Sequence, residues 1–200
     1  QTCALPICFE YLAVILFIHS CLAQNNIIKT SNMKNINIVE FNSHQINGEY
    51  IRKMDDGTVV IQVGDSSGYT ERQIPESGWF YSYKEFYGSG ELKTEGKLFK
   101  KGEFQSGIWS QYDESGKLIS TTNYDEPYKL TIDSVLAIIK SEKIPFSLEN
   151  KYNEITREVL DSIAIWYVNW RIQQNRVETI EILDESGKTR SRNFYLINKN

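Results

Sequence analysis

Four pairs of adjacent carboxylates are the residues of this chain that most resemble a catalytic or metal-binding arrangement. Two carboxylates acting together can hydrolyse glycosides or hold calcium. The pairs are Asp55 with Asp56, Asp113 with Glu114, Asp125 with Glu126, and Asp184 with Glu185. They leave open an alternative function, a hydrolase of the cell envelope that uses one such pair.

The surroundings of two of these pairs favour a simpler interpretation. The pentapeptide Asp-Glu-Ser-Gly-Lys occupies residues 113–117 and again residues 184–188, each time between two expected strands. In a turn of this kind the Asp side chain accepts backbone N–H groups and the Gly adopts a positive φ angle. We therefore predict two hairpin turns here, and no catalytic or metal-binding role for their carboxylates.

Nucleophilic catalysis and zinc binding depend on residue types that are scarce in this chain. It has two histidines, His19 and His44, and three cysteines, Cys3, Cys8 and Cys21. A catalytic Ser, Cys or Thr needs an oriented base, which is usually histidine, and structural zinc sites use Cys and His. No Gly-rich phosphate loop opens a helix after a strand. We expect His44 to be a surface residue, and we predict no enzyme, no cofactor and no metal.

Aromatic residues form the candidate partner-binding surface. Flat rings stack on sugars and on partner side chains, but they also fill the core of a thin sheet through cross-strand pairs, which is the simpler role. Period-2 alternation places several of these rings on one face, so some are expected to stay exposed. The residues are Trp79, Tyr81, Tyr83, Tyr87, Trp109 and Tyr112.

The beginning of the chain predicts export. Tyr11 to Ile18 is an uncharged apolar run, and the small residues Cys21 and Ala23 after it fit cleavage by a signal peptidase after Ala23. A membrane span needs about 20 apolar residues, and this run is much shorter. The expected signal peptide is therefore residues 1–23, and the expected location is periplasmic or secreted.

Two further expectations concern the same segment. Ile18 to Cys21 resembles a bacterial lipobox, with His19 as the unusual residue, so lipidation at Cys21 is the alternative that would tether the protein to a membrane. Gln1 to Ile7 resembles the translation of a common sequencing-adapter oligonucleotide, and we expect it to replace the true N-terminus. With all three cysteines in this segment, the mature chain folds without disulfides.

The charge of the chain bears on its partners. The formal net charge is −4, so no basic field is available to attract nucleic acid. We expect a protein or a cell-envelope component as the partner, no nucleic acid, and a membrane only if Cys21 is lipidated.

Residues 24–45 are rich in Asn and lack a sustained period, which predicts a flexible leader. Short strands with turn residues between them follow. The expected strands of this first half are 49–53, 58–63, 69–74, 79–86, 91–99, 107–112 and 118–124.

A repeat lies in this β region. Phe86, Gly90, Leu92 and Leu98 recur 26 positions further on, from 90 to 116 for the glycine, as Tyr112, Gly116, Leu118 and Tyr124. A unit of this size cannot cover its own apolar face, so the repeated unit needs a neighbour for stability. The residues Phe86 to Lys93, Gly107 to Tyr112 and Gly116 to Leu118 resemble the MORN-variant repeat of bacterial proteins often labelled YwqK-type antitoxins. That resemblance implies an elongated antiparallel sheet over residues 46–125.

The second half predicts one helix followed by strands. Thr131 is a natural N-cap, and Ile132, Val135, Leu136 and Ile139 share one helical face. Residues 154–160 remain ambiguous between strand and helix. Residues 163–172 predict the strongest strand, with Ala164, Trp166, Val168 and Trp170 on one face, and further strands are expected at 177–183 and 192–197.

This order of a Thr-Ile-Asp helix, a tryptophan-rich strand and an Asp-x-x-Gly-Lys turn resembles a PepSY-like module over residues 126–200. The resemblance implies an extracytoplasmic α+β unit without catalytic groups. The fold class expected for the chain is therefore α+β and mostly β. The expected function is that of a non-catalytic binding or scaffold protein, with a peptidase inhibitor or an immunity or antitoxin-like protein as the alternative.

Overall fold

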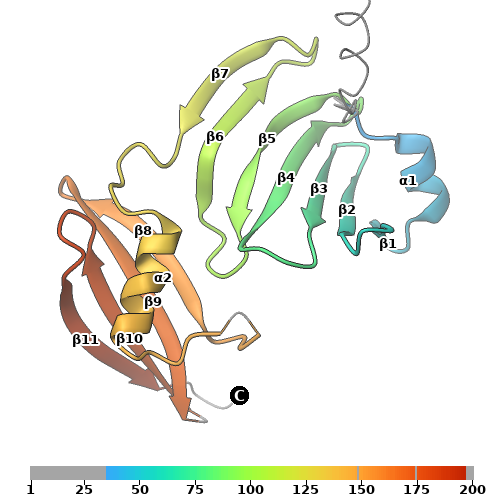
Figure 1. Cartoon of the computed structure of the whole chain (residues 1–200). Helices are drawn as coiled ribbons and strands as arrows, with labels where there is room; N and C mark the ends of the chain where they lie inside the picture. The colour runs from blue at the N-terminus through green and yellow to red at the C-terminus, as the bar shows by residue number, and fades with distance from the viewer. Residues whose placement is uncertain (1–34, 148, 174, 197–200) are drawn as a thin grey trace, which may run out of the picture. The chain divides into compact units, whose positions relative to one another are not determined.

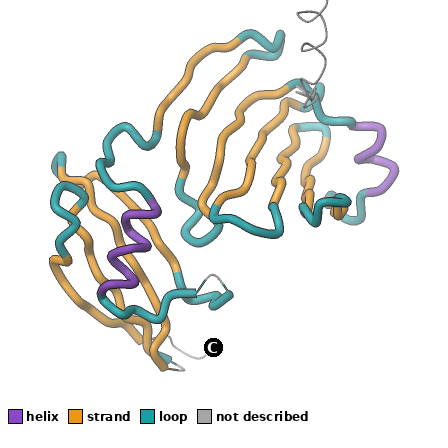
Figure 2. The backbone as a smooth tube through the Cα atoms, in the orientation of Figure 1, coloured by secondary structure: helices purple, strands orange, loops and turns teal. Residues whose placement is uncertain are grey.

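The computed structural model describes residues 35–147, 149–173 and 175–196. In this part of the chain 53% of residues lie in strands and 11% in helices, and all strands pair antiparallel. The expected α+β, mostly β class is confirmed (Figure 2). The predicted signal peptide and the possible lipidation site Cys21 lie outside the described residues. No helix of the described ranges is long and apolar enough to cross a membrane.

The first sheet has seven strands that neighbour one another in chain order (Figure 1). Each strand turns back on the one before it, which is the simplest way to join short antiparallel strands. The strands are β1 (Glu49–Lys53), β2 (Val59–Asp65), β3 (Gly68–Ile74), β4 (Phe80–Tyr87), β5 (Leu92–Phe99), β6 (Gln105–Tyr112) and β7 (Leu118–Asn123).

The hairpins β4–β5 and β6–β7 share a detailed geometry. A bulge in the pairing occurs at Glu85/Phe86 in the first hairpin and at Gln111/Tyr112 in the second, which is the same shift of 26 positions as in the sequence repeat. The two turns close with equivalent hydrogen bonds. The amide of Tyr87 donates to the carbonyl of Glu91, and the amide of Asp113 donates to the carbonyl of Lys117, both at a distance of 2.9 Å. The repeated residues therefore build two hairpins of one kind.

A short helix precedes the sheet, within the segment expected to be a flexible leader. The helix α1 (Ile38–His44) begins at Asn37, whose side chain accepts the amide of Glu40, and it buries Phe41. The Phe41 ring meets the Tyr69 ring edge-on at 5.2 Å between centroids. Ile36 and Phe41 are buried with Tyr69 of the sheet, and Ile38 packs beside them, so apolar side chains anchor this segment on the sheet.

The second half forms a helix packed on a four-stranded sheet of order β11-β10-β9-β8 (Figure 1). The predicted helix is present as α2 (Ile132–Ser141), with Thr131 as its N-cap and Val135 and Ile139 buried. Residues 154–160, left ambiguous by the sequence, form a strand. The strands are β8 (Glu154–Leu160), β9 (Ile163–Gln173), β10 (Arg176–Leu183) and β11 (Thr189–Leu196).

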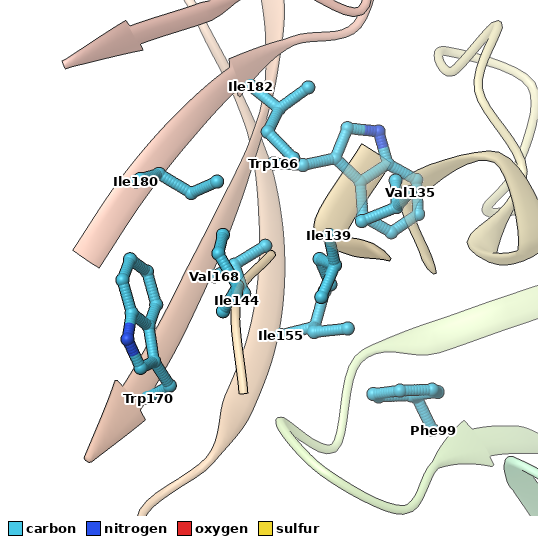
Figure 3. Packing of buried hydrophobic residues seen from close by; sticks show 10 residues of the cluster. All are labelled: Phe99, Val135, Ile139, Ile144, Ile155, Trp166, Val168, Trp170, Ile180 and Ile182. Carbon is cyan, nitrogen blue, oxygen red and sulfur yellow. The ribbon is translucent and has the colours of Figure 1, made fainter. Parts of the chain in front are cut away.

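One hydrophobic core joins this half to the first sheet. Trp166, Val168 and Trp170 share a face of β9 as predicted, and they pack with α2 (Figure 3). Phe99, which ends β5 of the seven-stranded sheet, is buried in the same core. The amide of Ile155 in β8 also donates to the carbonyl of Lys101 at 2.8 Å.

Candidate functional site

The six predicted aromatic residues do not form a single surface. Trp79 packs against the shared core, and the hydroxyl of Tyr87 donates to the carbonyl of Tyr112 at 2.9 Å near the opposite end of the sheet. Tyr81, Tyr83 and Trp109 lie on the face of the sheet between these two places. Tyr81 and Trp109 are buried and the other four are partly buried, so only part of the cluster is available to a partner.

A groove of about 760 Å³ opens where this face meets the second half of the chain. Its volume lies within the range of about 300 to 1,000 Å³ that small-molecule pockets span. Five aromatic rings line it, namely those of Tyr83, Phe104, Trp109, Tyr124 and Tyr128, together with the charged side chains Glu85, Glu103 and Arg157. Sequence reasoning named only Tyr83 and Trp109 of this set.

The indole of Trp109 forms the floor of the groove. It lies flat against Gly96 of β5, where a Cβ atom would overlap the ring, and its N–H donates to the carbonyl of Lys97 at 3.3 Å. The rings of Tyr83 and Tyr124 flank it, with centroids 5.8 and 6.0 Å away. Glycine at position 96 thus allows the ring to lie on the strand, and the two tyrosines hold it there.

The tyrosine hydroxyls beside the floor are held by carboxylates. Tyr83 donates to Glu85 at 3.0 Å, and Tyr81 donates to Glu103 at 3.4 Å. Burial, followed by the hydrogen bond to Glu85, raises the pKa of Tyr83 to about 12. The hydroxyl donates to Glu85 in its protonated form, and this hydrogen bond orients the ring.

The two carboxylates leave the groove with an acidic lining. Glu85 and Glu103 are partly exposed, and each forms an ion pair at 4.0 Å, with Lys93 and Arg72 respectively. Exposed ion pairs at this distance are weak, so these carboxylates remain open to a cationic group.

Arg157 is the one basic residue of the lining, and its charge is already paired. Its Nη2 atom donates to Asp125 and to the carbonyl of Gln105, both at 2.6 Å, and its side chain is only 5% exposed. The guanidinium lies 4.5 Å from the Phe104 ring and 4.2 Å from the Tyr128 ring. Arg157 therefore builds a wall of the groove and fastens β8 to the first sheet.

One carboxylate of each predicted pair is bound within the fold. Asp56 accepts the amide of Thr58 at 2.9 Å, and Asp125 binds Arg157. Asp113 accepts the amides of Ser115 and Lys117, both at 3.0 Å, which confirms the predicted turn. No group of three or more His, Cys, Asp or Glu side chains that suits a metal ion occurs in residues 35–147, 149–173 and 175–196.

The side chain of Asp184 does not have the local turn-capping role that the sequence predicts. Its pentapeptide does form a turn, closed by the amide of Gly187 on the carbonyl of Leu183 at 2.8 Å. The Asp184 side chain, however, is 3% exposed and accepts the indole N–H of Trp166 at 2.8 Å. It also accepts the amides of Lys129 and Leu130, at 2.6 and 3.0 Å, immediately before α2. The only sequence signal for this role is a tryptophan N–H in a predicted core strand, which needs an acceptor.

His44 lies at the exposed end of α1, as expected of a surface residue. Its ring stacks on Tyr50 at 5.1 Å, and its Nδ1 atom is 2.9 Å from the hydroxyl of Ser43. Local contacts account for its position.

Comparison of the chain with protein-family models, with curated proteins and with solved structures found no match.

Proposed function

We propose that this chain is a non-enzymatic binding protein and that the groove floored by Trp109 holds an extended segment of a protein partner. The observation that carries the proposal is the set of rings around this groove, which other side chains and the backbone fix in place. Rings ordered before binding lose little conformational freedom when a partner stacks on them.

The chemistry of the lining indicates what the segment carries. Glu85 and Glu103 offer partly exposed carboxylates, while Arg157 is paired with Asp125. A lysine or arginine beside an apolar or aromatic side chain matches this combination, because the cation meets the carboxylates and the ring faces while the apolar group covers Trp109. An uncharged glycan would match the rings but would add no opposite charge beside the two partly exposed carboxylates.

The two hairpins with equivalent bulges and turns support the proposal that the first sheet is of the MORN-variant type. The helix on a four-stranded antiparallel sheet supports the PepSY-like proposal for the second half. Export is part of the same proposal, on the strength of the apolar run Tyr11 to Ile18 and the small residues after it.

Fluorescence titration tests the groove directly. Trp109 is the one tryptophan in its lining and keeps 6% of its surface exposed, whereas Trp166 and Trp170 are 0% and 1% exposed in the core of the second half. We would titrate the protein with a library of nine-residue peptides that vary the number of Lys and Arg residues, and with soluble peptidoglycan fragments. We expect basic peptides with an aromatic or aliphatic residue to bind, and their affinity to fall as salt is added.

Matched variants locate the binding. Tyr124→Ala removes an exposed ring of the groove and is expected to weaken binding about tenfold, an effect typical of one aromatic contact. Tyr195→Ala removes a similarly exposed ring from β11, outside the groove, and is expected to leave binding unchanged. The proposal fails if no peptide binds, if only peptidoglycan fragments bind, or if Tyr195→Ala weakens binding as much as Tyr124→Ala.

A further inference from the structure

A second, smaller cavity of about 250 Å³ shares part of its wall with the groove. Phe104, Tyr128 and Arg157 line both spaces. Of the two, Trp109 lines only the groove and Trp166 lines only the smaller cavity. The other residues that line the smaller cavity are Phe80, Ser106, Asp125, Leu130, Thr131 and Ile132. A ligand in each space would therefore lie against a different tryptophan.

Aromatic and aliphatic side chains form most of the wall of the smaller cavity. Phe80, Phe104, Tyr128, Leu130 and Ile132 pack against the core of the second half, yet they are only partly buried, so apolar surface remains open to a ligand. An apolar cavity of about 150 Å³ stays dry and is large enough to bind benzene. The smaller cavity, at about 250 Å³, has room for two fused rings.

Most polar side chains of this wall already have partners in the fold. The hydroxyl of Ser106 donates to the carboxylate of Asp125 at 3.2 Å, and Asp125 also binds Arg157. The hydroxyl of Thr131 accepts the amide of Ser134 at 3.2 Å. A ligand with several polar groups would find few free partners here, so the cavity favours a mainly apolar molecule.

The hydroxyl of Tyr128 is available for one polar contact. It has no hydrogen-bond partner within residues 35–147, 149–173 and 175–196. A phenolic hydroxyl can both donate and accept a hydrogen bond, and a tyrosine in an apolar site usually has a partner for it. One N–H or one acceptor atom on the ligand would supply that partner.

The charges around the cavity disfavour an ionised ligand. Arg157 is the one positive group of the wall, and it faces the carboxylates of Asp125 and of Asp184, which binds the indole N–H of Trp166. An anion would be repelled by the two carboxylates. A cation would lie beside the guanidinium of Arg157, which already covers the Phe104 and Tyr128 rings at 4.5 and 4.2 Å.

We infer that this cavity binds a neutral, planar molecule of two fused rings that carries one polar group. Indole has this shape and one N–H, which makes it a suitable probe. The site is separate from the groove for the protein partner, because its ligand lies against Trp166 and not against Trp109.

Proton-nitrogen correlation spectra of the full chain, recorded during titration with indole, test the inference. We expect the indole N–H resonance of Trp166 to shift and to saturate, with a dissociation constant of about 0.1 to 1 mM for a ligand of this size. The Trp109 resonance should stay in place. Indole-3-carboxylate has the same rings but a negative charge, and it is expected to leave the Trp166 resonance unchanged.

Two matched variants locate the site. Ile132→Trp fills the cavity with a new side chain and is expected to abolish indole binding, while its circular dichroism spectrum confirms the fold. Ile119→Trp makes the same change at a residue of β7 that is 62% exposed and lines neither space. It is expected to bind indole like the wild type.

The inference is overturned if indole leaves the wild-type Trp166 resonance in place, or if the Trp109 resonance shifts instead. It is also overturned if a folded Ile132→Trp variant binds indole as tightly as the wild type, or if indole-3-carboxylate binds as well as indole. Should Ile132→Trp fail to fold, the wild-type titrations with the two probes still decide the question.

Discussion

The pentapeptide Asp-Glu-Ser-Gly-Lys occurs twice in the chain, in two different structural environments. At residues 113–117 the exposed turn is capped by its own aspartate, which accepts the amides of Ser115 and Lys117. At residues 184–188 the backbone also turns, but the aspartate points into the core and binds Trp166 and the amides before α2. The same five residues thus make a local turn in one place and a long-range connection in the other.

The difference arises from what the rest of the chain places beside each aspartate. Buried N–H groups must find acceptors, and the core near residue 184 contains three of them. Trp166 in turn meets the Phe104 and Tyr128 rings edge-on, with centroids 5.6 and 5.5 Å away. Asp184 therefore supports the aromatic wall of the groove, whereas Asp113 supports only its own hairpin.

The largest difference between the copies should appear when each aspartate is replaced by alanine. Asp184→Ala leaves the indole of Trp166 and two backbone amides without an acceptor, and it is expected to lower the free energy of unfolding by about 4 kcal/mol. Asp113→Ala exposes its turn amides to water, so a much smaller change is expected. Urea denaturation followed by tryptophan fluorescence measures both. An equal decrease in the free energy of unfolding of the two variants would show that the two aspartates stabilise the fold to the same extent.

Asp125 extends the comparison to a third carboxylate, which is held by a buried partner. Arg157→Ala removes that partner and its contacts with three aromatic rings, and it is expected to cost about 3 kcal/mol in unfolding free energy. Lys129→Ala is the matched control, because Lys129 and Glu185 form an ion pair on the surface. Thermal unfolding should separate the variants clearly, and a similar melting temperature for both would argue against the role of Arg157.

The glycines of the two turns sharpen the comparison at the level of the backbone. Gly116 and Gly187 have φ angles of +78° and +66°, so alanine is expected to cost about 1 kcal/mol at either position. At Gly187 the new methyl group would also lie 3.3 Å from the side chain of Ile138 in α2, whereas at Gly116 no atom is within 4 Å. We expect Gly187→Ala to be the more destabilising change in urea denaturation. The reverse order would mean that turn 184–188 is not packed against α2.

The smallest expected effect is the change in unfolding free energy with pH that comes from Asp113, in the exposed turn 113–117. The hydroxyl of Ser115 and the amides of its turn lower the pKa of Asp113 below 3.8. A carboxylate with a lowered pKa in the folded state stabilises the fold above its unfolded pKa, and this contribution is lost as the pH falls through the folded value. The unfolding free energies of the wild type and Asp113→Asn should therefore converge as the pH falls below about 4. A constant difference over this range would exclude the carboxylate as the cause.

Much of the fold could be predicted because it depends on local patterns. The helix α2 begins at Thr131 and buries Val135 and Ile139, and β9 buries Trp166, Val168 and Trp170, as their periods indicate. Less of the groove could be predicted, because its walls form between residues distant in the chain. Arg157 binds Gln105 and Asp125, and Asp184 binds the amide of Lys129. These residues are far apart in the chain, so no local sequence period predicts their contacts. The helix α1 was not predicted, because the Asn-rich segment around it lacks a sustained apolar period, although Phe41 and Ile38 pack on the sheet.

The most direct test of the groove uses the four tryptophan side chains as reporters. Each indole N–H gives its own resonance in a proton-nitrogen correlation spectrum. On addition of a basic nine-residue peptide that binds, the resonance of Trp109 should shift, while those of the buried Trp166 and Trp170 should stay in place. A peptide that binds without moving the Trp109 resonance would contradict the proposed function.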